Sequence, residues 1–480
     1  MFSFHSIAQY HEQLNKDEVT CVDAVNFFLK KIEDAKRLNA FVEIYNAESI
    51  ERANHLDEKK KSGKDCGKLF GVIVGIKDVI CYKDHKVTAA SAILSNFISL
   101  YNATVVENLL KEDAIIIGVC NCDEFAMGST NENSAYGRVL NALDEKKVPG
   151  GSSGGSAVAV QAGLCMASLG SDTGGSVRQP ADFCGIVGMK PTYGCVSRHG
   201  LIAYASSFDQ VGVFSNSIED CTKILEVISG PDKYDSTVNQ EKKQTFSFQK
   251  CEQKYRIALL KNAIDHKSLD PEIRNSICLL ANQLKEDDHS IEEANFDLID
   301  FIVPTYYVLT TAEASSNLAR YDGVRYGYRS KTTSQDITSF YKKTRSEGFG
   351  KEVKRRIMLG TFVLTEGYYD AYYTKAQQIR RLLVNLTDEL FKKFDVLLLP
   401  TAPSTAFETG SMQKDPVAMY LADIYTVYAN LTGNPAVSIP LFKHSNQMPF
   451  GVQAIAKKND ELTLLQFSDL LMNKYRQYNL

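Results

Sequence analysis

The sequence has no tryptophan, no long apolar run and no surplus of positive charge. Its longest apolar stretches, such as residues 71–76 and 114–119, are far shorter than the ~18 residues that a membrane-spanning helix needs. Lys and Arg total 54 against 58 Asp and Glu, which gives a net charge of −4. Because no global positive field would attract a polyanion, we expect another subunit to hold any nucleic acid that takes part in the function.

Cysteines are absent from the chain after Cys278. The 11 cysteines, from Cys21 to Cys278, are an odd number and are scattered, which does not indicate a disulfide framework. Cys120 and Cys122 form a C-x-C pair, but no second pair of Cys or His follows at zinc-finger spacing. We therefore predict reduced cysteines in the core and no metal site.

The N-terminal segment also lacks the features of a targeting sequence. It has neither a charged start followed by an apolar run nor an Arg-rich, acid-poor composition, so we predict a cytoplasmic protein. The whole chain is 44% hydrophobic and 23% charged, as in ordinary globular proteins. This composition excludes disorder, collagen and coiled coil as descriptions of the whole molecule.

Apolar periodicity predicts an α/β protein. The first ~65 residues favour helices, because residues such as Val25, Leu29 and Ile32 recur three and four positions apart. A solvated turn is expected at 57–65. From residue 69, short β-branched runs alternate with helical windows such as 104–113, which is typical of α/β layers.

The second half is predicted to be more helical. A polar interval at 232–254 is either a linker or a surface excursion of one domain, and the sequence leaves both open. We expect one long helix over 351–383 and a final helix at the C-terminus, with strands near 395–400 and 436–441.

A glycine- and serine-rich run at 150–156 comes directly before an Ala/Val-rich segment. Such runs are commonly flexible linkers, but the apolar segment that follows indicates a loop held inside the protein. No Lys-Ser or Lys-Thr follows the glycines, so a phosphate-binding loop is excluded. Gly-x-Ser-x-Gly occurs around Ser152 and Ser153, but the preceding residues are not strand-like, so a nucleophile elbow is weakly supported.

Two further features of the sequence could take part in catalysis. Ser176 follows Asp-Thr-Gly-Gly, where glycines would let backbone N–H groups approach a substrate, although a tight turn would explain the same residues. Lys77 ends an apolar run that looks like a buried strand, where an ammonium group is costly and its pKa should fall. A salt bridge with Asp78 is the structural alternative for Lys77.

No histidine lies in a glycine-rich or strand-end context, so a Ser-His-Asp triad has little support. Lys77, Ser152 and Ser176 instead suggest a Ser–Ser–Lys relay, in which a neutral lysine accepts the proton. These three residues, in GIKD, GGSSGG and DTGGS, resemble the motifs of the amidase signature family, which uses a Ser–cis-Ser–Lys triad.

The resemblance implies an α/β fold with a large mixed β-sheet flanked by helices. It implies Ser176 as the nucleophile, Ser152 as the bridging serine after a cis peptide bond, and Lys77 as the base. The N–H groups of Thr173, Gly174, Gly175 and Ser176 would form the oxyanion hole. We expect one domain over 1–480, with a helical part at about 1–65, core motifs at 66–212, and helical elaborations with the remaining core at 213–480.

Several longer segments resemble one branch of the family, the glutaminase subunits of tRNA-dependent amidotransferases. They are FAMGSTNENSAYG, VPGGSSGGSA, KPTYGCVSRHGLIAYASSFDQVG, EASSNLARYDGVRYGYR and SEGFGKEVKRRIMLGTF. Two positions depart from that branch, where 141–144 read Asn-Ala-Leu-Asp in place of Asn-Pro-Trp-Asp and Val213 replaces Pro. Neither departure touches the triad.

This second resemblance implies hydrolysis of glutamine, with ammonia passed to a B subunit that converts Glu-tRNA(Gln) to Gln-tRNA(Gln), and in some assemblies Asp-tRNA(Asn) to Asn-tRNA(Asn). A small C subunit would complete a heterotrimer, and tRNA would be contacted mainly through the B subunit. ATP and Mg²⁺ would be used by the partner, with no cofactor in this chain. The alternatives are a free-standing hydrolase of small amides and a non-catalytic subunit that keeps the loops as scaffold.

Glutamine carries a carboxylate and an ammonium group, so a selective pocket needs one cation and one anion. If 353–360 is helical, Arg355 and Arg356 lie about 100° apart, and family position favours Arg356 for the carboxylate. Asp423 would bind the ammonium group from a helix that begins at Asp415-Pro416 and shares a side with Met419 and Thr426.

Tyr307 and Ser129 match further family contacts to glutamine, although core packing or a turn hydroxyl explains each of them equally well. Surface charge or an internal ion pair is the alternative for Arg356 and Asp423.

Overall fold

The computed structural model describes residues 2–240, 246, 253–332, 334, 336–411 and 422–477. The expected helix start at Asp415-Pro416, together with Met419, lies outside the described residues, as does much of the polar interval at 232–254.

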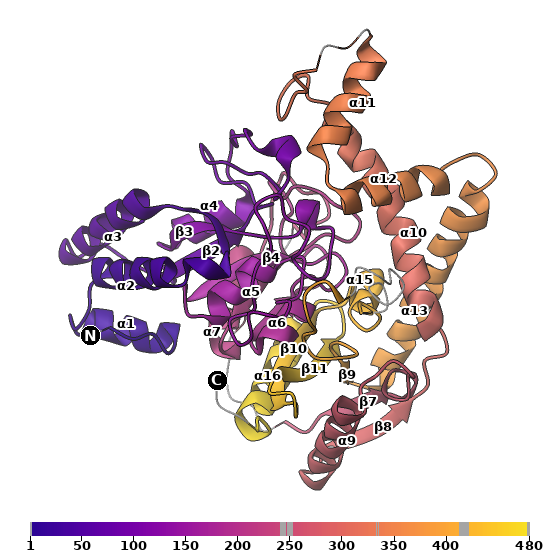
Figure 1. The fold of residues 1–480 in the computed structure, drawn as a ribbon. Coiled ribbons are helices and arrows are strands. Elements are labelled where there is room, and N and C mark those ends of the chain that lie inside the picture. The colour runs from indigo at the N-terminus through magenta and orange to yellow at the C-terminus, as the bar shows by residue number, and fades with distance from the viewer. Residues whose placement is uncertain are drawn as a thin grey trace.

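The fold is built on a mixed β-sheet, which has 11 strands within the described residues in the order β1-β3-β2-β4-β6-β5-β10-β11-β9-β7-β8 (Figure 1). The pairs β2/β3, β2/β4, β7/β8 and β7/β9 are parallel, and the other neighbouring pairs are antiparallel. The strands are β1 (Phe41–Ile44), β2 (Ile73–Lys77), β3 (Ile115–Cys120), β4 (Ala167–Ser171), β5 (Val187–Lys190), β6 (Val211–Ser215), β7 (Arg256–Leu260), β8 (Ser290–Ala294), β9 (Val396–Pro400), β10 (Ala436–Lys443) and β11 (Pro449–Ala456).

Helices flank this sheet and confirm the predicted fold class. In the described residues, α5 and α6 pack on the central strands and on each other, and α7 packs on β6 and on α16. The helices are α1 (Ile7–Asn15), α2 (Cys21–Asp34), α3 (Asn46–Lys61), α4 (Thr104–Lys111), α5 (Gly154–Gln161), α6 (Arg178–Cys184), α7 (Ile218–Ile228), α8 (Lys261–Ile264), α9 (Pro271–Glu286), α10 (Ile299–Asn317), α11 (Ile337–Gly348), α12 (Lys351–Val363), α13 (Lys375–Lys393), α15 (Val427–Thr432) and α16 (Glu461–Lys474).

The N-terminal helices follow from local signals in the sequence. Thr20 and Asp23 form a capping box at the start of α2, whose apolar face buries Val25, Phe28 and Ile32. The helix α3 continues to Lys61, so the solvated turn predicted at 57–65 begins five residues later than expected. The cause is tertiary, because Asp57 accepts hydrogen bonds from the first backbone N–H groups of α2 and holds the end of α3 there.

The long helix predicted over 351–383 is wrong. The chain forms α12, leaves the helix at Leu364, and resumes as a π-helical turn (Tyr369–Thr374) that leads into α13. Gly367 lies between these elements with φ of +84°, a left-handed conformation that glycine adopts at helix ends. The apolar and aromatic period continues across this break, which is why the sequence pattern did not reveal it.

In the described residues, no helix is both long enough and apolar enough to cross a membrane. No group of three or more His, Cys, Asp or Glu in those residues could hold a metal ion. Cys120 and Cys122 are free thiols buried at the end of β3, which confirms the prediction of reduced core cysteines for this pair.

Candidate active site

Lys77 lies at the end of β2, where its side chain is fully buried. Its Nζ contacts three hydroxyl groups, Oγ of Ser152 at 2.7 Å, Ser153 at 2.9 Å and Ser171 at 2.8 Å. Burial lowers the pKa of Lys77 to about 8, because the charged form loses its hydration. A substantial fraction of this amine is therefore neutral near pH 8.

The contacts of Ser153 constrain the protons around Lys77. The hydroxyl of Ser153 donates to the backbone oxygen of Ser171 at 3.1 Å, so its oxygen accepts from Lys77. A neutral amine has two N–H donors and one lone pair. The lone pair is thus left for a hydroxyl donated by Ser152 or Ser171, which is the arrangement that a lysine base requires.

The salt bridge considered between Lys77 and Asp78 is not formed. The carboxylate of Asp78 accepts from the backbone N–H groups of Thr88 and Ala90, each at 2.8 Å, and from the Thr88 hydroxyl. Neighbouring residues of a strand point to opposite faces, so Asp78 turns away from the serines. This alternative for Lys77 is excluded.

The serine-rich loop before α5 is buried and tightly packed. The peptide bond between Gly151 and Ser152 is cis, as the family resemblance implies. A side chain at Gly151 would overlap the carboxylate of Asp123. The backbone N–H of Asp123 donates to the backbone oxygen of Ser152 at 3.0 Å. The flexible-linker interpretation is therefore wrong, and the nucleophile-elbow interpretation also fails because no strand ends at Ser152 or Ser153.

Ser176 lies in the turn between β4 and α6, and it is partly exposed while its neighbours are buried. The backbone oxygen of Ser176 accepts from the Ser153 N–H at 3.3 Å, so the two serine loops lie side by side. The Oγ atoms of Ser152 and Ser176 are not hydrogen-bonded to each other in the described structure. The predicted relay therefore has its Lys77–Ser152 half in place, whereas its Ser152–Ser176 half remains a prediction.

Asp172 organises the turn that carries Ser176. Its carboxylate accepts from the N–H groups of Gly175 at 2.8 Å and Val177 at 3.2 Å. The Gly175 N–H is thus already engaged, so its assignment as an oxyanion donor does not fit this arrangement. The N–H groups of Thr173, Gly174 and Ser176 make no hydrogen bond within the described residues and keep the predicted role.

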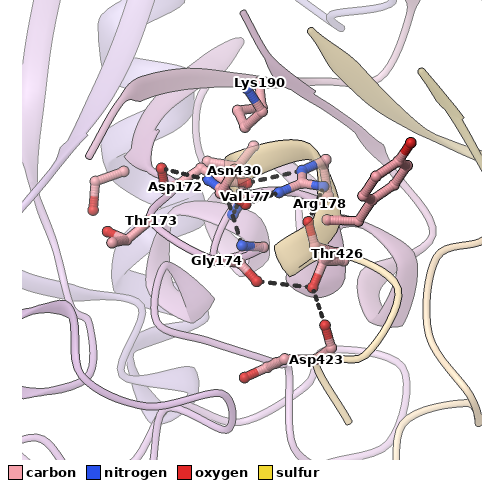
Figure 2. A network of polar contacts seen from close by, with 12 residues as sticks. Asp172, Thr173, Gly174, Val177, Arg178, Lys190, Asp423, Thr426 and Asn430 are labelled. Atoms are coloured by element: carbon pink, nitrogen blue, oxygen red, sulfur yellow. Dashed lines mark hydrogen bonds and ion pairs between the residues drawn. The ribbon is translucent and has the colours of Figure 1, made fainter. Parts of the chain in front are cut away.

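A buried ion pair fixes Asp172 (Figure 2). Arg178 contacts both of its carboxylate oxygens, at 2.9 and 3.1 Å, and both side chains are fully buried. Burial alone would raise the pKa of Asp172, but the charge and hydrogen bonds of Arg178 hold that pKa well below its usual range. The remaining donors of Arg178 reach acceptors on Thr426, Asn430 and Gln453, which tie the turn to the C-terminal third of the chain.

Thr426 joins this turn to a second cluster of polar residues. Its hydroxyl contacts the backbone oxygens of Gly174 at 2.8 Å and Asp423 at 3.2 Å (Figure 2). The Asp423 carboxylate in turn accepts from Ser129 at 2.8 Å and from Tyr307 at 3.1 Å. Three of the four predicted glutamine contacts therefore meet at a single carboxylate oxygen.

Asp423 is buried and has no cation as a direct partner in the described residues. Burial raises the pKa of Asp423 to about 6, and the hydroxyls of Ser129 and Tyr307 partly oppose this rise. Its Oδ1 makes no hydrogen bond within the described residues. Surface charge is excluded as an explanation for Asp423, and so is an ion pair with Arg356.

Arg356 is buried on α12, whereas the neighbouring Arg355 side chain is 47% exposed, as the predicted helical angle between them requires. Its Nε donates to Glu352 at 2.9 Å, and its Nη1 donates to the Tyr204 hydroxyl at 2.9 Å. The guanidinium also lies 5.4 Å from the centre of the Tyr307 ring, so Arg356 is beside the Asp423 cluster. The internal ion pair considered for Arg356 does exist, with Glu352.

Sequence reasoning did not find several residues of this site. The DTGGS motif contains Asp172 and lies beside Ser171 and Arg178. The available signal was the presence of one acidic and one basic residue, Asp172 and Arg178, next to the glycines. Glu352 is four residues before Arg356, a spacing that indicates a helical ion pair. Tyr204 and Asn430 had no local signal, since only the fold brings them to the site.

Comparisons with known proteins identify the family of this chain. The family model described as Amidase matches residues 23–465 of the chain. The chain belongs to the amidase family. Its predicted membership and its mixed-sheet fold are thus confirmed.

Two curated relatives of this amidase chain match nearly its whole length. The A subunit of the glutamyl-tRNA(Gln) amidotransferase of Chlorobium phaeobacteroides is 44% identical over 473 residues, covering 98% of this chain and 99% of its own. The protein of the same name from Fusobacterium nucleatum is 46% identical over 475 residues, with coverage of 98% and 97%.

Solved structures show the same amidase fold. The A subunit of the glutamyl-tRNA(Gln) amidotransferase of Thermotoga maritima superposes with a TM-score of 0.81 at 34% identity, covering 99% of this chain and 96% of its own. The peptide amidase of Stenotrophomonas maltophilia gives a TM-score of 0.83 at 23% identity, with coverage of 99% and 98%, which concerns the fold alone.

Proposed function

We propose that this amidase-family chain is the glutamine-hydrolysing subunit of a glutamyl-tRNA(Gln) amidotransferase, and that it supplies ammonia for converting Glu-tRNA(Gln) to Gln-tRNA(Gln). The observation that carries the hydrolytic part is the contact of Lys77 with Ser152, with Ser176 on the adjacent loop. The identity of 44–46% to proteins of that name, over nearly their whole length, supports the choice of reaction.

The proposed reaction begins with attack by Ser176 Oγ on the side-chain amide carbon of glutamine. The Ser176 proton passes to Ser152 as the Ser152 proton passes to neutral Lys77. Negative charge develops on the amide oxygen, where the N–H groups of Thr173, Gly174 and Ser176 can stabilise it. The carbon–nitrogen bond then breaks, the nitrogen takes the proton back from Lys77 through Ser152, and ammonia leaves.

The product of this first half is a γ-glutamyl ester on Ser176. Water attacks that ester while Lys77 again accepts a proton through Ser152. Glutamate is released and the Ser176 hydroxyl is restored. The cycle uses only groups that the chain contains, together with glutamine and one water molecule.

Selection of glutamine is proposed to rest on two opposite charges near Ser176. Oδ1 of Asp423, which has no hydrogen bond within the described residues, would bind the α-ammonium group, while Ser129 and Tyr307 orient the carboxylate through Oδ2. Arg356 would bind the α-carboxylate with Nη2, the guanidinium nitrogen that has no partner within the described residues. An amide without these two charges would gain neither contact.

Because the proposed reaction needs a site that activates and amidates tRNA-bound glutamate, we propose a B subunit that receives the ammonia and contacts most of the tRNA. A small C subunit would complete a heterotrimer in the cytoplasm. ATP and Mg²⁺ would be used by the partner. Aspartate on tRNA(Asn) is a second acceptor for the same ammonia in some assemblies.

Intact-mass measurement during glutamine turnover tests the nucleophile. We expect a γ-glutamyl adduct on the wild-type chain and none on Ser176→Ala. Ser153→Ala is the matched control, because it removes a neighbouring hydroxyl that contacts Lys77 but does not lie on the Ser176 turn. An adduct that persists in Ser176→Ala would refute the assignment.

Purification with associated proteins tests the assembly. We expect two further chains to copurify and the complex to transfer ammonia to charged tRNA in the presence of ATP. A monomer that hydrolyses many small amides would instead support the free-standing amidase.

A further inference from the structure

Tyr204 occupies a position that the proposed reaction does not yet use. Its side chain is only 1% exposed, and its hydroxyl lies between Nη1 of Arg356 at 2.9 Å and Oγ1 of Thr310 at 3.1 Å. The Thr310 hydroxyl donates to the backbone oxygen of Tyr306 at 2.8 Å, so it accepts from Tyr204. The donor and the acceptor of each hydrogen bond from Arg356 through Tyr204 and Thr310 to Tyr306 are therefore fixed. The Tyr204 hydroxyl acts toward Arg356 only as an acceptor.

Two acceptors thus hold the Arg356 guanidinium in one plane. Glu352 binds Nε and Tyr204 binds Nη1, while the Tyr204 and Tyr307 rings lie 5.5 and 5.4 Å from the guanidinium carbon. A planar guanidinium with these two nitrogens fixed has a fixed direction for Nη2. Without the Tyr204 hydroxyl, Nη2 of Arg356 would no longer be held in this orientation, although the positive charge of Arg356 would remain.

The backbone of Tyr204 is connected to the nucleophile loop. Asp209 Oδ2 accepts from the N–H groups of Tyr204 at 2.9 Å and Ala205 at 3.0 Å. The other oxygen of Asp209 accepts from the Thr173 hydroxyl at 2.7 Å. The backbones of Asp172 and Gln210 also pair, with N–O distances of 2.7 and 3.2 Å.

We propose that Tyr204 is a positioning residue for substrate selection, whose hydroxyl orients Arg356 toward the α-carboxylate of glutamine and whose segment, through Asp209, also sets the position of Thr173. The inference rests on the proposed function, because it assigns a purpose to Arg356 that glutamine binding provides. One segment, residues 204–209, thereby connects the group that recognises the substrate to the loop that stabilises the oxyanion.

Tyr204→Phe tests the first connection, because it keeps the ring and removes only the hydroxyl. A hydrogen bond to a charged group is strong enough that its loss should raise KM for glutamine roughly 10-fold, with kcat within about twofold of wild type. Glutamine methyl ester, whose α-carboxyl group carries no charge, should be hydrolysed equally by both proteins. The assays use the chain assembled with its copurifying partners.

The matched control is Tyr428→Phe. Tyr428 is also buried, and its hydroxyl contacts Thr387 on α13 at 2.6 Å, whereas no hydrogen bond joins it to Arg356 within the described residues. Both variants should lose similar thermal stability, but only Tyr204→Phe should change KM. An unchanged KM in Tyr204→Phe, or an equal loss on glutamine and its methyl ester, would overturn the role of Tyr204.

Thr173→Val tests the second connection, since it keeps the backbone N–H but removes the hydroxyl that Asp209 holds. We expect kcat to fall roughly 10-fold with KM nearly unchanged, and Thr173→Ser to restore kcat because it keeps the hydroxyl. If Thr173→Val retains full kcat, or if Thr173→Ser is equally slow, the connection through Asp209 is wrong.

Failure of the inference can be separated from failure of the proposed function. If the wild-type complex does not hydrolyse glutamine, or if Arg356→Gln leaves KM unchanged, the proposed function or its carboxylate site is wrong. If Arg356→Gln raises KM and Tyr204→Phe does not, only the positioning role is refuted.

Discussion

At the scale of single residues, the chemistry of this site follows from burial of groups that are normally charged in water. Lys77 and Asp423 are both buried without an opposite charge in direct contact. Burial lowers the pKa of Lys77 to about 8 and raises that of Asp423 to about 6. Each shift moves the group toward its neutral form. Because the mechanism needs Lys77 neutral and Asp423 charged, both groups favour high pH, Asp423 above about 6 and Lys77 above about 8.

Replacement of Lys77 by Arg should abolish glutamine hydrolysis. Arginine keeps the positive charge but does not deprotonate at accessible pH, so it cannot accept the proton from Ser152. In the wild-type protein, protonation of Lys77 removes the base, so kcat should rise about tenfold per pH unit below about 8 and level off above it. Steady-state kinetics between pH 6 and 9.5 measure both effects.

Ser171→Ala is the comparison variant for this prediction. It removes a different hydroxyl from Lys77, at 2.8 Å, and should reduce kcat less than Ser152→Ala does. A flat kcat profile across the same pH range, or a Lys77→Arg variant with near-normal activity, would exclude the lysine base.

Loss of the charge on Asp423 should weaken glutamine binding. KM of the wild-type protein should increase as pH falls through about 6, because protonated Asp423 no longer attracts the α-ammonium group. Asp423→Asn should have a high KM at every pH, and Arg356→Gln should also raise KM. Arg356→Gln should in addition lower thermal stability, because it removes the partner of the buried Glu352 carboxylate. Initial rates at varied glutamine concentrations give these values.

Arg355→Gln is the matched control. Arg355 contacts the same Glu352, at 2.8 Å, but it is half exposed and turned away from Asp423. Its KM should equal that of the wild type. If Asp423→Asn and Arg356→Gln lose stability while KM stays constant, the two residues are structural.

At the scale of secondary-structure elements, strands and most helices could be predicted because their signals are local. The runs at 73–77 and 115–120 are β-branched and became β2 and β3, and capping residues marked the start of α2. The break after α12 could not be predicted, since it depends on the left-handed conformation of Gly367 inside a continuous helical period. Short local patterns specify an element more reliably than they specify its end.

The candidate site shows the same division. Lys77, Ser152 and Ser176 could be found because each stands in a distinctive short motif. The contacts of Tyr204 with Arg356 and of Asn430 with Asp172 join residues 152 and 258 positions apart, so no local pattern contains them. Family resemblance supplied the proposed glutamine-binding residues, but it did not supply Tyr204 or Glu352, which contact Arg356.

The buried pair of Asp172 and Arg178 is expected to control the stability of the turn that carries Ser176. Asp172→Asn would leave a fully buried guanidinium without its counter-charge, which costs about 3–5 kcal/mol of unfolding free energy. Because the pKa of Asp172 is lowered in the folded state, its stabilisation is complete above about pH 4 and is lost as pH falls further. Urea unfolding of both proteins at several pH values measures the difference.

Asp34→Asn provides the comparison, since its ion pair with Lys30 is largely exposed and should contribute little. The difference in unfolding free energy between the wild type and Asp172→Asn should become smaller as the pH falls below about 4. A gap that stays constant down to pH 2, or one no larger than that of Asp34→Asn, would show that the charge of Asp172 does not hold the turn.

At the scale of the whole molecule, the site is assembled from both halves of the chain. The sheet runs without interruption from β1 to β8, and β5 of the first half pairs with β10 of the second. Arg178 contacts Thr426, Asn430 and Gln453 across the same junction. The polar interval at 232–254 therefore does not separate two independent sheets, and neither half contains a complete site.

This architecture predicts that the chain unfolds as one cooperative unit, as the predicted single domain over 1–480 requires. The absence of tryptophan makes the test specific, because one introduced tryptophan reports on one place only. Phe27→Trp places the probe on α2 of the first half, and Phe394→Trp places it between α13 and β9 of the second. Urea transitions followed by the two fluorescence signals and by circular dichroism should have the same midpoint, since the shared sheet couples the halves. The control is that each variant matches the wild type by circular dichroism. If the Phe27→Trp signal then changed at a clearly different urea concentration from the Phe394→Trp signal, the chain would consist of two separately stable parts. The site would in that case depend on the docking of those parts rather than on one continuous fold.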